Sequence, residues 1–196
     1  MSSPVELKER VAWLERELPP NPPRFKIHDS LPFAVLRYDP EEEWLLRREV
    51  KHLATRLEKE GLTAKIVSLA DMLWRAVDHS EGMAAVAALE RSHGFEAAQA
   101  QVQTYLSDAD FQPLADQVAS EVAGLDPGRS VAFLVRAAAL APGLYPLSTL
   151  LHELQGRTLV PIILCYPGRL EGTNRLRFMG LPDRDSRGSY RVKIYA

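Results

Sequence analysis

Two aspartates near the C-terminal end of the chain have the spacing of a possible acid-base pair. Asp183 and Asp185 stand in the segment PDRDSRGS, where Arg184 and Arg187 lie between and beside them. Neighbouring carboxylates can act as general acid and general base. Mixed charges between two strand-like segments are, however, typical of a solvated turn, in which exposed ion pairs contribute little. We therefore interpret this segment as a turn and assign no catalytic residue to it.

Arginines follow the most apolar run of the chain and could bind phosphate or carboxylate groups through paired hydrogen bonds. Residues 169–196 hold seven Lys/Arg against three Asp/Glu, so they carry +4 while residues 1–168 carry −6. Aromatic residues interleave with this basic strip, which comprises Arg169, Arg175, Arg177, Tyr190, Arg191, Lys193 and Tyr195. A strand with one buried face places its arginines on the solvent-exposed face whether or not they bind anything. We therefore favour ordinary solvent-exposed strands as the interpretation and keep DNA contact as the alternative.

The motifs of nucleotide hydrolysis and of metal binding are absent from the sequence. No GxxxxGK[ST] phosphate loop follows a strand-like segment, and neither CxxC nor HExxH occurs. The sequence predicts neither ATP hydrolysis nor a cofactor, although a metal site assembled from distant residues stays open. Cys165 lies inside an apolar run, and we favour a core role for it over that of a nucleophile. The histidines are scattered over different segments, as His28, His52, His79, His93 and His152.

Composition predicts an ordinary soluble protein with a single domain over residues 1–196. Of the 196 residues, 46% are hydrophobic and 26% charged, which suffices for one well-buried core. The net charge of −2 gives no overall attraction to nucleic acid or anionic lipid. The single cysteine, the acidic residues near the start and the lack of a long apolar run predict a cytoplasmic protein without a disulfide, a signal peptide or a membrane span.

The apolar run Ile162–Cys165 predicts the centre of a β-sheet. A short run rich in β-branched residues is typical of a strand that is buried on both faces. We expect Tyr166 to be the last paired residue before the chain turns at Pro167-Gly168. Because loops at the carboxyl ends of central strands usually carry the function of an open α/β sheet, the loop from Tyr166 to Gly172 is the first place to look for a site.

Hydrophobic periodicity predicts alternating strands and helices before this central strand. We expect Asp39 and Pro40 to begin one helix and Gly61 to end it, and Asp110 is available to cap the last helix of a helical insertion. That insertion either covers the sheet, which we favour, or presents a partner surface. In chain order we expect a helix, a strand, a helix, a strand, the insertion, a strand and a helix at residues 1–18, 32–38, 40–60, 63–69, 70–125, 130–136 and 146–155.

The last part of the chain changes its pattern to a period of two. Leu176 and Phe178 alternate with arginines, and Tyr190, Val192 and Ile194 alternate with basic residues, which predicts a C-terminal antiparallel strand pair. The whole pattern predicts an α/β fold: a three-layer sandwich with a mainly parallel central sheet, like a P-loop scaffold that lacks the Walker A loop.

The segment Tyr166–Phe178, YPGRLEGTNRLRF, resembles the signature of a known family. Its aromatic-Pro-Gly, acidic-Gly and apolar-x-Phe pattern is similar to that of the BrxB family of bacterial BREX phage-defence systems. Tyr38-Asp39-Pro40 followed by glutamates, Tyr145-Pro146 before a leucine-rich helix, and Tyr190-Arg191 agree with that pattern, so the resemblance runs from about Pro32 onward. The chain departs from it in lacking an arginine shortly after Pro146 and a second tyrosine beside Tyr190.

The resemblance implies a non-catalytic component of a multi-protein defence system. Family members look like adaptors that contact the alkaline-phosphatase-like protein PglZ and are associated with the ATPase BrxC. We accordingly expect no enzymatic activity, no cofactor and no membrane partner, with DNA contact within the complex as the alternative. The residues that we expect to bind partners are Tyr166, Pro167, Gly168, Arg169, Glu171, Gly172, Arg175, Arg177, Tyr190 and Arg191.

Overall fold

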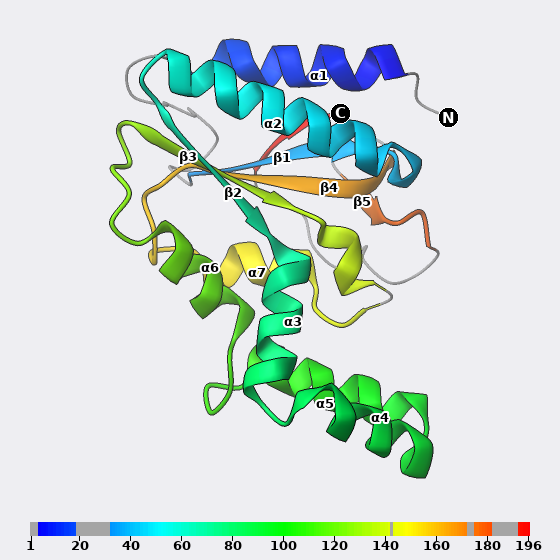
Figure 1. Ribbon diagram of the computed structural model, residues 1–196. Helices are drawn as coiled ribbons and strands as arrows, with labels where there is room; N and C mark the ends of the chain where they lie inside the picture. The colour runs from blue at the N-terminus through cyan, green and yellow to red at the C-terminus, as the bar shows by residue number, and fades with distance from the viewer. Residues whose placement is uncertain (1–3, 19–31, 142, 172–174, 182–191) are drawn as a thin grey trace.

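One β-sheet forms the middle layer of the molecule, and helices lie on both of its faces (Figure 1). The computed structural model describes residues 4–18, 32–141, 143–171, 175–181 and 192–196. Within them the strand order is β2-β3-β4-β1-β6, with parallel neighbours throughout, and β5 pairs antiparallel with β4. The strands are β1 (Phe33–Tyr38), β2 (Thr63–Ser68), β3 (Ser130–Val135), β4 (Ile162–Glu171), β5 (Arg175–Phe178) and β6 (Lys193–Tyr195). The predicted α/β class and the central position of β4 are confirmed.

Two helices, α1 (Pro4–Glu17) and α2 (Glu43–Lys59), cover one face of the sheet (Figure 1). Their apolar residues recur at helical spacing, so each helix buries one stripe against the sheet. A short 3₁₀ turn, η2 (Pro40–Glu42), connects β1 directly to α2, and Gly61 follows α2 with a φ of +85°, which suits glycine. The core on this face includes Leu7, Val11, Leu14, Leu46, Val50, Leu53, Leu57, Phe133 and Ile163.

The opposite face of the sheet carries α3 (Leu69–His79), α6 (Leu114–Val122), η3 (Ala137–Leu140) and α7 (Leu147–Glu153). The prediction that Asp110 caps the last helix of the insertion is wrong. The Asp110 N–H donates to Asp108 in a turn (2.9 Å), and α6 begins at Leu114 after Pro113, which stands at the N-cap position. The core on this face includes Phe33, Val35, Leu134, Leu150, Leu154, Ile162 and Leu164.

Helices α4 (Gly82–His93) and α5 (Phe95–Ser107) pack on each other and on α3, and they extend away from the sheet (Figure 1). Burial on α4 is confined to Val86. The insertion was predicted to be helical, which the structure confirms. Its predicted role of covering the sheet holds for α3 and α6, whereas α4 and α5 form a projection of their own.

Strand β4 does not end at Tyr166, so the prediction of a loop from Tyr166 to Gly172 is wrong. The strand pairs with β1 up to Pro167 and then with β5 from Gly168 to Glu171. The Pro167 carbonyl accepts a hydrogen bond from the Met179 N–H (2.8 Å), so the proline joins the ladder as an acceptor, a role that needs no N–H of its own. Pro167 thus marks an exchange of partners, and Gly172 lies outside the described residues.

The two C-terminal segments do not pair with each other as predicted. Strand β5 pairs antiparallel with β4, while β6 pairs parallel with β1 and stands at the end of the strand order opposite β2. A period of two shows that a segment is a half-buried strand but does not identify its neighbour, which depends on contacts between distant residues. Tyr190 and Arg191, and the predicted turn with Asp183 and Asp185, lie outside the described residues.

The carboxylate of Glu17, at the end of α1, holds β6 against that helix. It accepts hydrogen bonds from Trp13 Nε1 (2.8 Å), from the Tyr195 hydroxyl (2.7 Å) and from the Lys193 ammonium. Burial alone would raise the pKa of Glu17, but the hydrogen bonds from Lys193, Tyr195 and Trp13 outweigh it and hold the pKa below its usual range.

We expect the free energy of unfolding to fall in acid partly because Glu17 becomes protonated. A carboxyl whose pKa is lowered by folding stabilises the protein above its unfolded pKa, about 4.3, and this contribution is lost as the pH falls through the folded pKa. A Glu17→Gln variant should therefore lose stability at neutral pH and lose less of it on acidification than the wild type. Urea denaturation across acid and neutral pH measures both effects, with Glu96→Gln on α5 as the control. Identical pH profiles for Glu17→Gln and wild type would contradict this role.

A candidate docking site at the carboxyl edge of the sheet

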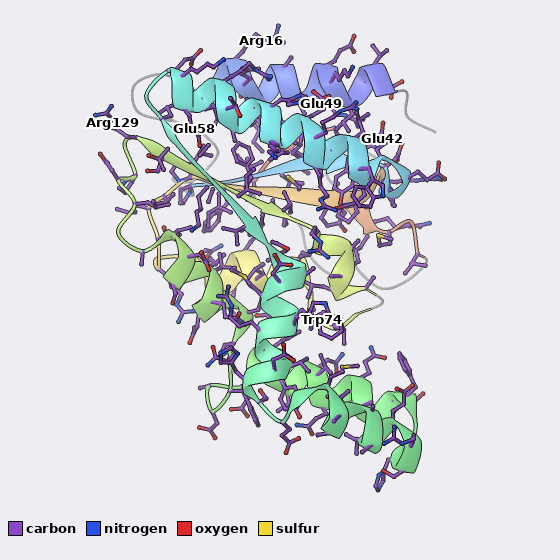
Figure 2. All side chains as sticks on the ribbon, viewed as in Figure 1. Arg16, Glu42, Glu49, Glu58, Trp74 and Arg129 are labelled. Atoms are coloured by element: carbon purple, nitrogen blue, oxygen red, sulfur yellow. The ribbon has the colours of Figure 1, made fainter. Side chains whose placement is uncertain are left out.

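A cavity of about 260 Å³ opens where β1 and β4 end, at the edge of the sheet at which α/β proteins usually carry their sites. Residues from η2 form one wall of this cavity, and β4 and the turn after β5 form the other. Glu42 stands at the start of α2 beside these strand ends (Figure 2). The lining residues are Asp39, Pro40, Glu41, Glu42, Arg169, Met179 and Gly180. Parallel pairing of β1 with β4 therefore brings Asp39-Pro40 beside Arg169, although the two segments are far apart in the sequence.

Three carboxylates, those of Asp39, Glu41 and Glu42, form the acidic wall of the cavity. Asp39 has an extended backbone and Pro40 begins the 3₁₀ turn, so all three fall within one tight bend. The Asp39 N–H donates to the Glu42 carboxylate (3.1 Å), which fixes the bend in the manner of a helix cap. The prediction that Asp39-Pro40 starts the helical segment after β1 is confirmed.

Two arginines behind the acidic wall hold two of these carboxylates. Arg37 Nη1 lies 2.9 Å from Asp39 Oδ1, and a guanidinium nitrogen of Arg10 lies 3.7 Å from Glu42 Oε2. Arg10 is 6% exposed and Glu42 9% exposed, so this second pair is nearly removed from water. Burial, together with the positive charge of Arg37, lowers the pKa of Arg10. Two of the three carboxylates that line the cavity, those of Asp39 and Glu42, thus belong to a largely buried network of charges.

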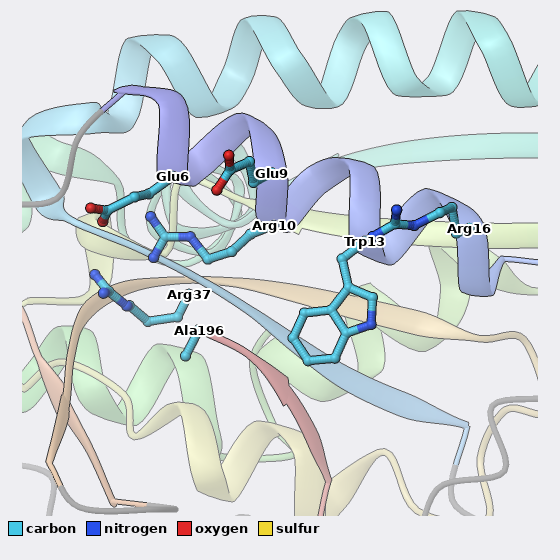
Figure 3. Close-up of a pocket in the computed structure, with 7 residues that line it drawn as sticks. All are labelled: Glu6, Glu9, Arg10, Trp13, Arg16, Arg37 and Ala196. Atoms are coloured by element: carbon cyan, nitrogen blue, oxygen red, sulfur yellow. The ribbon is translucent and has the colours of Figure 1, made fainter.

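A second cavity, of about 420 Å³, lies on the other side of these arginines, between α1 and β1. Figure 3 shows Arg10 from α1 and Arg37 from β1 reaching toward Glu6, with Trp13 and Arg16 farther along the helix. Arg10 and Arg37 line this cavity, whereas their partners Glu42 and Asp39 line the first one. The two ion pairs therefore form the partition between the cavities.

The residues Tyr166, Pro167 and Gly168 are buried and build the hairpin of β4 and β5. The rings of Tyr166 and Phe178 pack edge to face, with 5.6 Å between the ring centroids. A Cβ at position 168 would lie 2.2 Å from the Arg177 carbonyl oxygen, so only glycine allows the two strands to approach this closely. These residues are buried in the core, and the hairpin that they build sets the position of Arg169.

Arg169 is the predicted site residue that reaches the cavity with an exposed side chain. Arg177 pairs with it across the hairpin and is half-buried. Glu171 and Arg175 are register partners in the β4–β5 ladder. Gly172, Tyr190 and Arg191 lie outside the described residues. The basic strip is partly neutralised, since Lys193 is engaged by Glu17, and DNA contact by the strip stays a prediction.

Arg10 and Arg37 were not identified from the sequence as residues that support the site, although the position of each in its element could have indicated this role. Arg10 falls on the apolar stripe of α1, three residues after Leu7, and Arg37 is the charged residue of an otherwise apolar strand. A charge at a core position needs a partner, which predicts an ion pair. Cys165 is fully buried and burial raises its pKa, so the core role predicted for this thiol is confirmed.

Fold and cavity together define an α/β protein whose parallel sheet presents a mixed-charge surface site at its carboxyl edge. In the described ranges no cluster of three or more His, Cys, Asp or Glu could hold a metal ion, and no helix has the length and apolar content needed to cross a membrane.

The family model described as BREX protein BrxB matches residues 65–194, about two thirds of the chain. The chain therefore belongs to the BrxB family and is a component of a BREX phage-defence system. The matched range includes Arg169 but begins after Tyr38-Asp39-Pro40, which the resemblance had included. Searches of curated proteins and of solved structures returned no match.

Proposed function

We propose that this protein is a non-catalytic adaptor of a BREX complex, which joins the alkaline-phosphatase-like PglZ protein to the BrxC ATPase. Membership of the BrxB family supports a place in that complex. The observation that carries the adaptor role is the cavity in which Arg169 faces Asp39 and Glu42. Both signs of charge stand there on a rigid strand end and a fixed turn, which is the arrangement that gives a docking surface its specificity and its register.

Reversing the charge of Arg169 should weaken binding of the PglZ protein. Arg169→Glu would add a carboxylate to a cavity that already holds three, so an acidic group of the partner would be repelled instead of bound. We expect an affinity about tenfold lower, measured by biolayer interferometry with immobilised PglZ protein. Because the side chain is exposed, the thermal unfolding temperature should change little.

Arg91→Glu on α4 is the matched control, since it makes the same charge change at an exposed position on the projection. The control should bind as the wild type does. Equal affinity for the wild type and a folded Arg169→Glu variant would remove Arg169 from the docking surface.

The adaptor role itself is tested by mixing the wild-type protein with PglZ and BrxC, separately and together, and measuring the mass of the complexes by size-exclusion chromatography with light scattering. We expect a binary complex with PglZ and a ternary complex when BrxC is added. Separate elution of all three proteins would contradict the adaptor role.

A further inference from the structure

A groove of about 510 Å³, separate from the two cavities described above, lies between α2 and the ends of β2 and β3. It shares no lining residue with the cavity at Arg169. Helix α2 contributes Trp44, Arg47, Arg48 and Lys51, while β2 contributes Ile66 and the end of β3 contributes Arg136. We refer to it as the β2 groove. It includes the edge of the sheet opposite β6, and the proposed adaptor role makes no use of it.

Strand β2 has a ladder partner on one side only within the described residues, namely β3. In Figure 1 β2 crosses in front of the other strands. The Thr63 N–H donates to the Arg129 carbonyl in the direction of β3 (2.7 Å). Because backbone groups alternate along a strand, those of Ala64 and Ile66 point to the open side. An open edge of this kind is a template for one further strand.

Two large apolar side chains are exposed in the groove, one from α2 and one from β2. Trp44 is 78% exposed and Ile66 is 40% exposed, and both line the groove. Ile66 pairs in register with Phe133, on the face of the sheet that α2 covers, but α2 leaves it partly open. The Arg47 guanidinium stacks 4.8 Å from the centre of the Trp44 ring. This contact supports the ring in its exposed position.

The charge of the groove is positive, although the chain as a whole carries −2. Four cationic side chains line it against one carboxylate, that of Asp71, which is already paired with Arg136 (2.7 Å). Arg48 also lies 3.7 Å from the Glu49 carboxylate, which does not line the groove, so its charge is partly compensated. Arg47, Arg48 and Lys51 lie on two successive turns of α2 and line the wall of the groove that this helix forms. Acidic side chains on a segment that paired with β2 would therefore meet this row.

We propose that the β2 groove binds an extended acidic segment of a partner protein, which adds to the edge of β2 as a further strand. Backbone hydrogen bonds to Ala64 and Ile66 would hold the segment, an apolar side chain would contact Trp44 and Ile66, and acidic side chains would meet Arg48 and Lys51. A peptide fits better than nucleic acid for two reasons. Nucleic acid has no backbone groups that continue a β-ladder, and it offers no aliphatic group to pack against Ile66. The inference does not rest on the proposed adaptor role.

A random peptide library displayed on phage tests this proposal even though the partner protein is unidentified. The full-length protein is the bait, and a Trp44→Ala/Arg48→Glu variant serves for counter-selection. We expect enrichment of peptides in which acidic residues alternate with aliphatic or aromatic ones and proline is absent. Hydrogen exchange should then show protection of the Ala64 and Ile66 amides by an enriched peptide. Absence of enrichment over the counter-selection, or protection elsewhere in the chain, would overturn the proposal.

Single substitutions and a DNA probe complete the test. An enriched peptide, followed by fluorescence anisotropy, should bind Trp44→Ala and Arg48→Glu about tenfold more weakly than wild type. Trp74→Ala on α3 removes a second exposed tryptophan outside the groove and should bind normally (Figure 2). Unaltered peptide affinity in the two folded groove variants would overturn the proposal. So would single-stranded oligo-dT that binds more tightly than the peptide and depends on Trp44, since the groove would then be a nucleic-acid site.

Discussion

Replacing Gly168 with alanine should lower the free energy of unfolding by about 3 kcal/mol, because the added methyl group has no space. A Cβ there would lie 2.2 Å from the Arg177 carbonyl oxygen and 2.7 Å from Cε1 of Tyr166. The oxygen belongs to the backbone of the paired strand, so the clash cannot be relieved by a side-chain rotation. Strands β4 and β5 would have to separate, and Arg169 would leave its place beside Asp39. Urea denaturation measures the stability loss, and hydrogen exchange of residues 168–171 and 175–178 locates it.

Gly124→Ala is the matched control, because it adds the same methyl group where nothing lies within 4 Å. Gly124 has a φ of +79°, so alanine there is destabilised by a left-handed backbone, about 1 kcal/mol, but meets no clash. We expect Gly168→Ala to cost clearly more than Gly124→Ala and to weaken binding of the PglZ protein as well. Equal costs at the two positions would show that the strands of the hairpin can move apart easily.

The sequence predicted the elements of this fold well, because each element depends on local periodicity. The apolar stripe of α1 and the β-branched run at Ile162–Cys165 indicate a helix and a central strand whatever their neighbours are. The errors concern pairing. Tyr166 was expected to be the last paired residue of β4, and β6 was expected beside β5, since nothing local shows that Met179 reaches Pro167 or that Lys193 lies beside Ala34.

The sequence predicted one of the two walls of the candidate site. The segment after Ile162–Cys165 was expected to carry function, and Arg169 does line the cavity. The acidic wall opposite was interpreted as the start of a helix and not as part of the site, because its distance from Arg169 is set by the strand order, in which β1 lies next to β4. The family match begins after Asp39, so neither local pattern nor the matched range indicated that Asp39 and Arg169 face the same cavity.

The buried pair of Arg10 and Glu42 should matter more to stability than a shorter ion pair on the surface. Arg10→Met keeps most of the aliphatic part of the side chain but removes the charge, which leaves the nearly buried Glu42 carboxylate and its neighbour Asp39 with less compensation. We expect a loss of about 3 kcal/mol in the free energy of unfolding, measured by urea denaturation. The double variant Arg10→Met/Glu42→Gln should recover part of this loss, because the unpaired charge is then removed.

Arg56 and Glu15 provide the comparison, since they join α2 to α1 with a separation of 2.6 Å but with side chains 44% and 28% exposed. Water and salt screen such a pair, so Arg56→Met should cost no more than about 1 kcal/mol. If both substitutions cost the same, burial does not govern the strength of the pair at Arg10. If Arg10→Met is much the more costly, the acidic wall of the cavity at Arg169 depends on a charge supplied by α1. Binding of the PglZ protein should then weaken in Arg10→Met and remain normal in Arg56→Met, although neither arginine lines the cavity at Arg169.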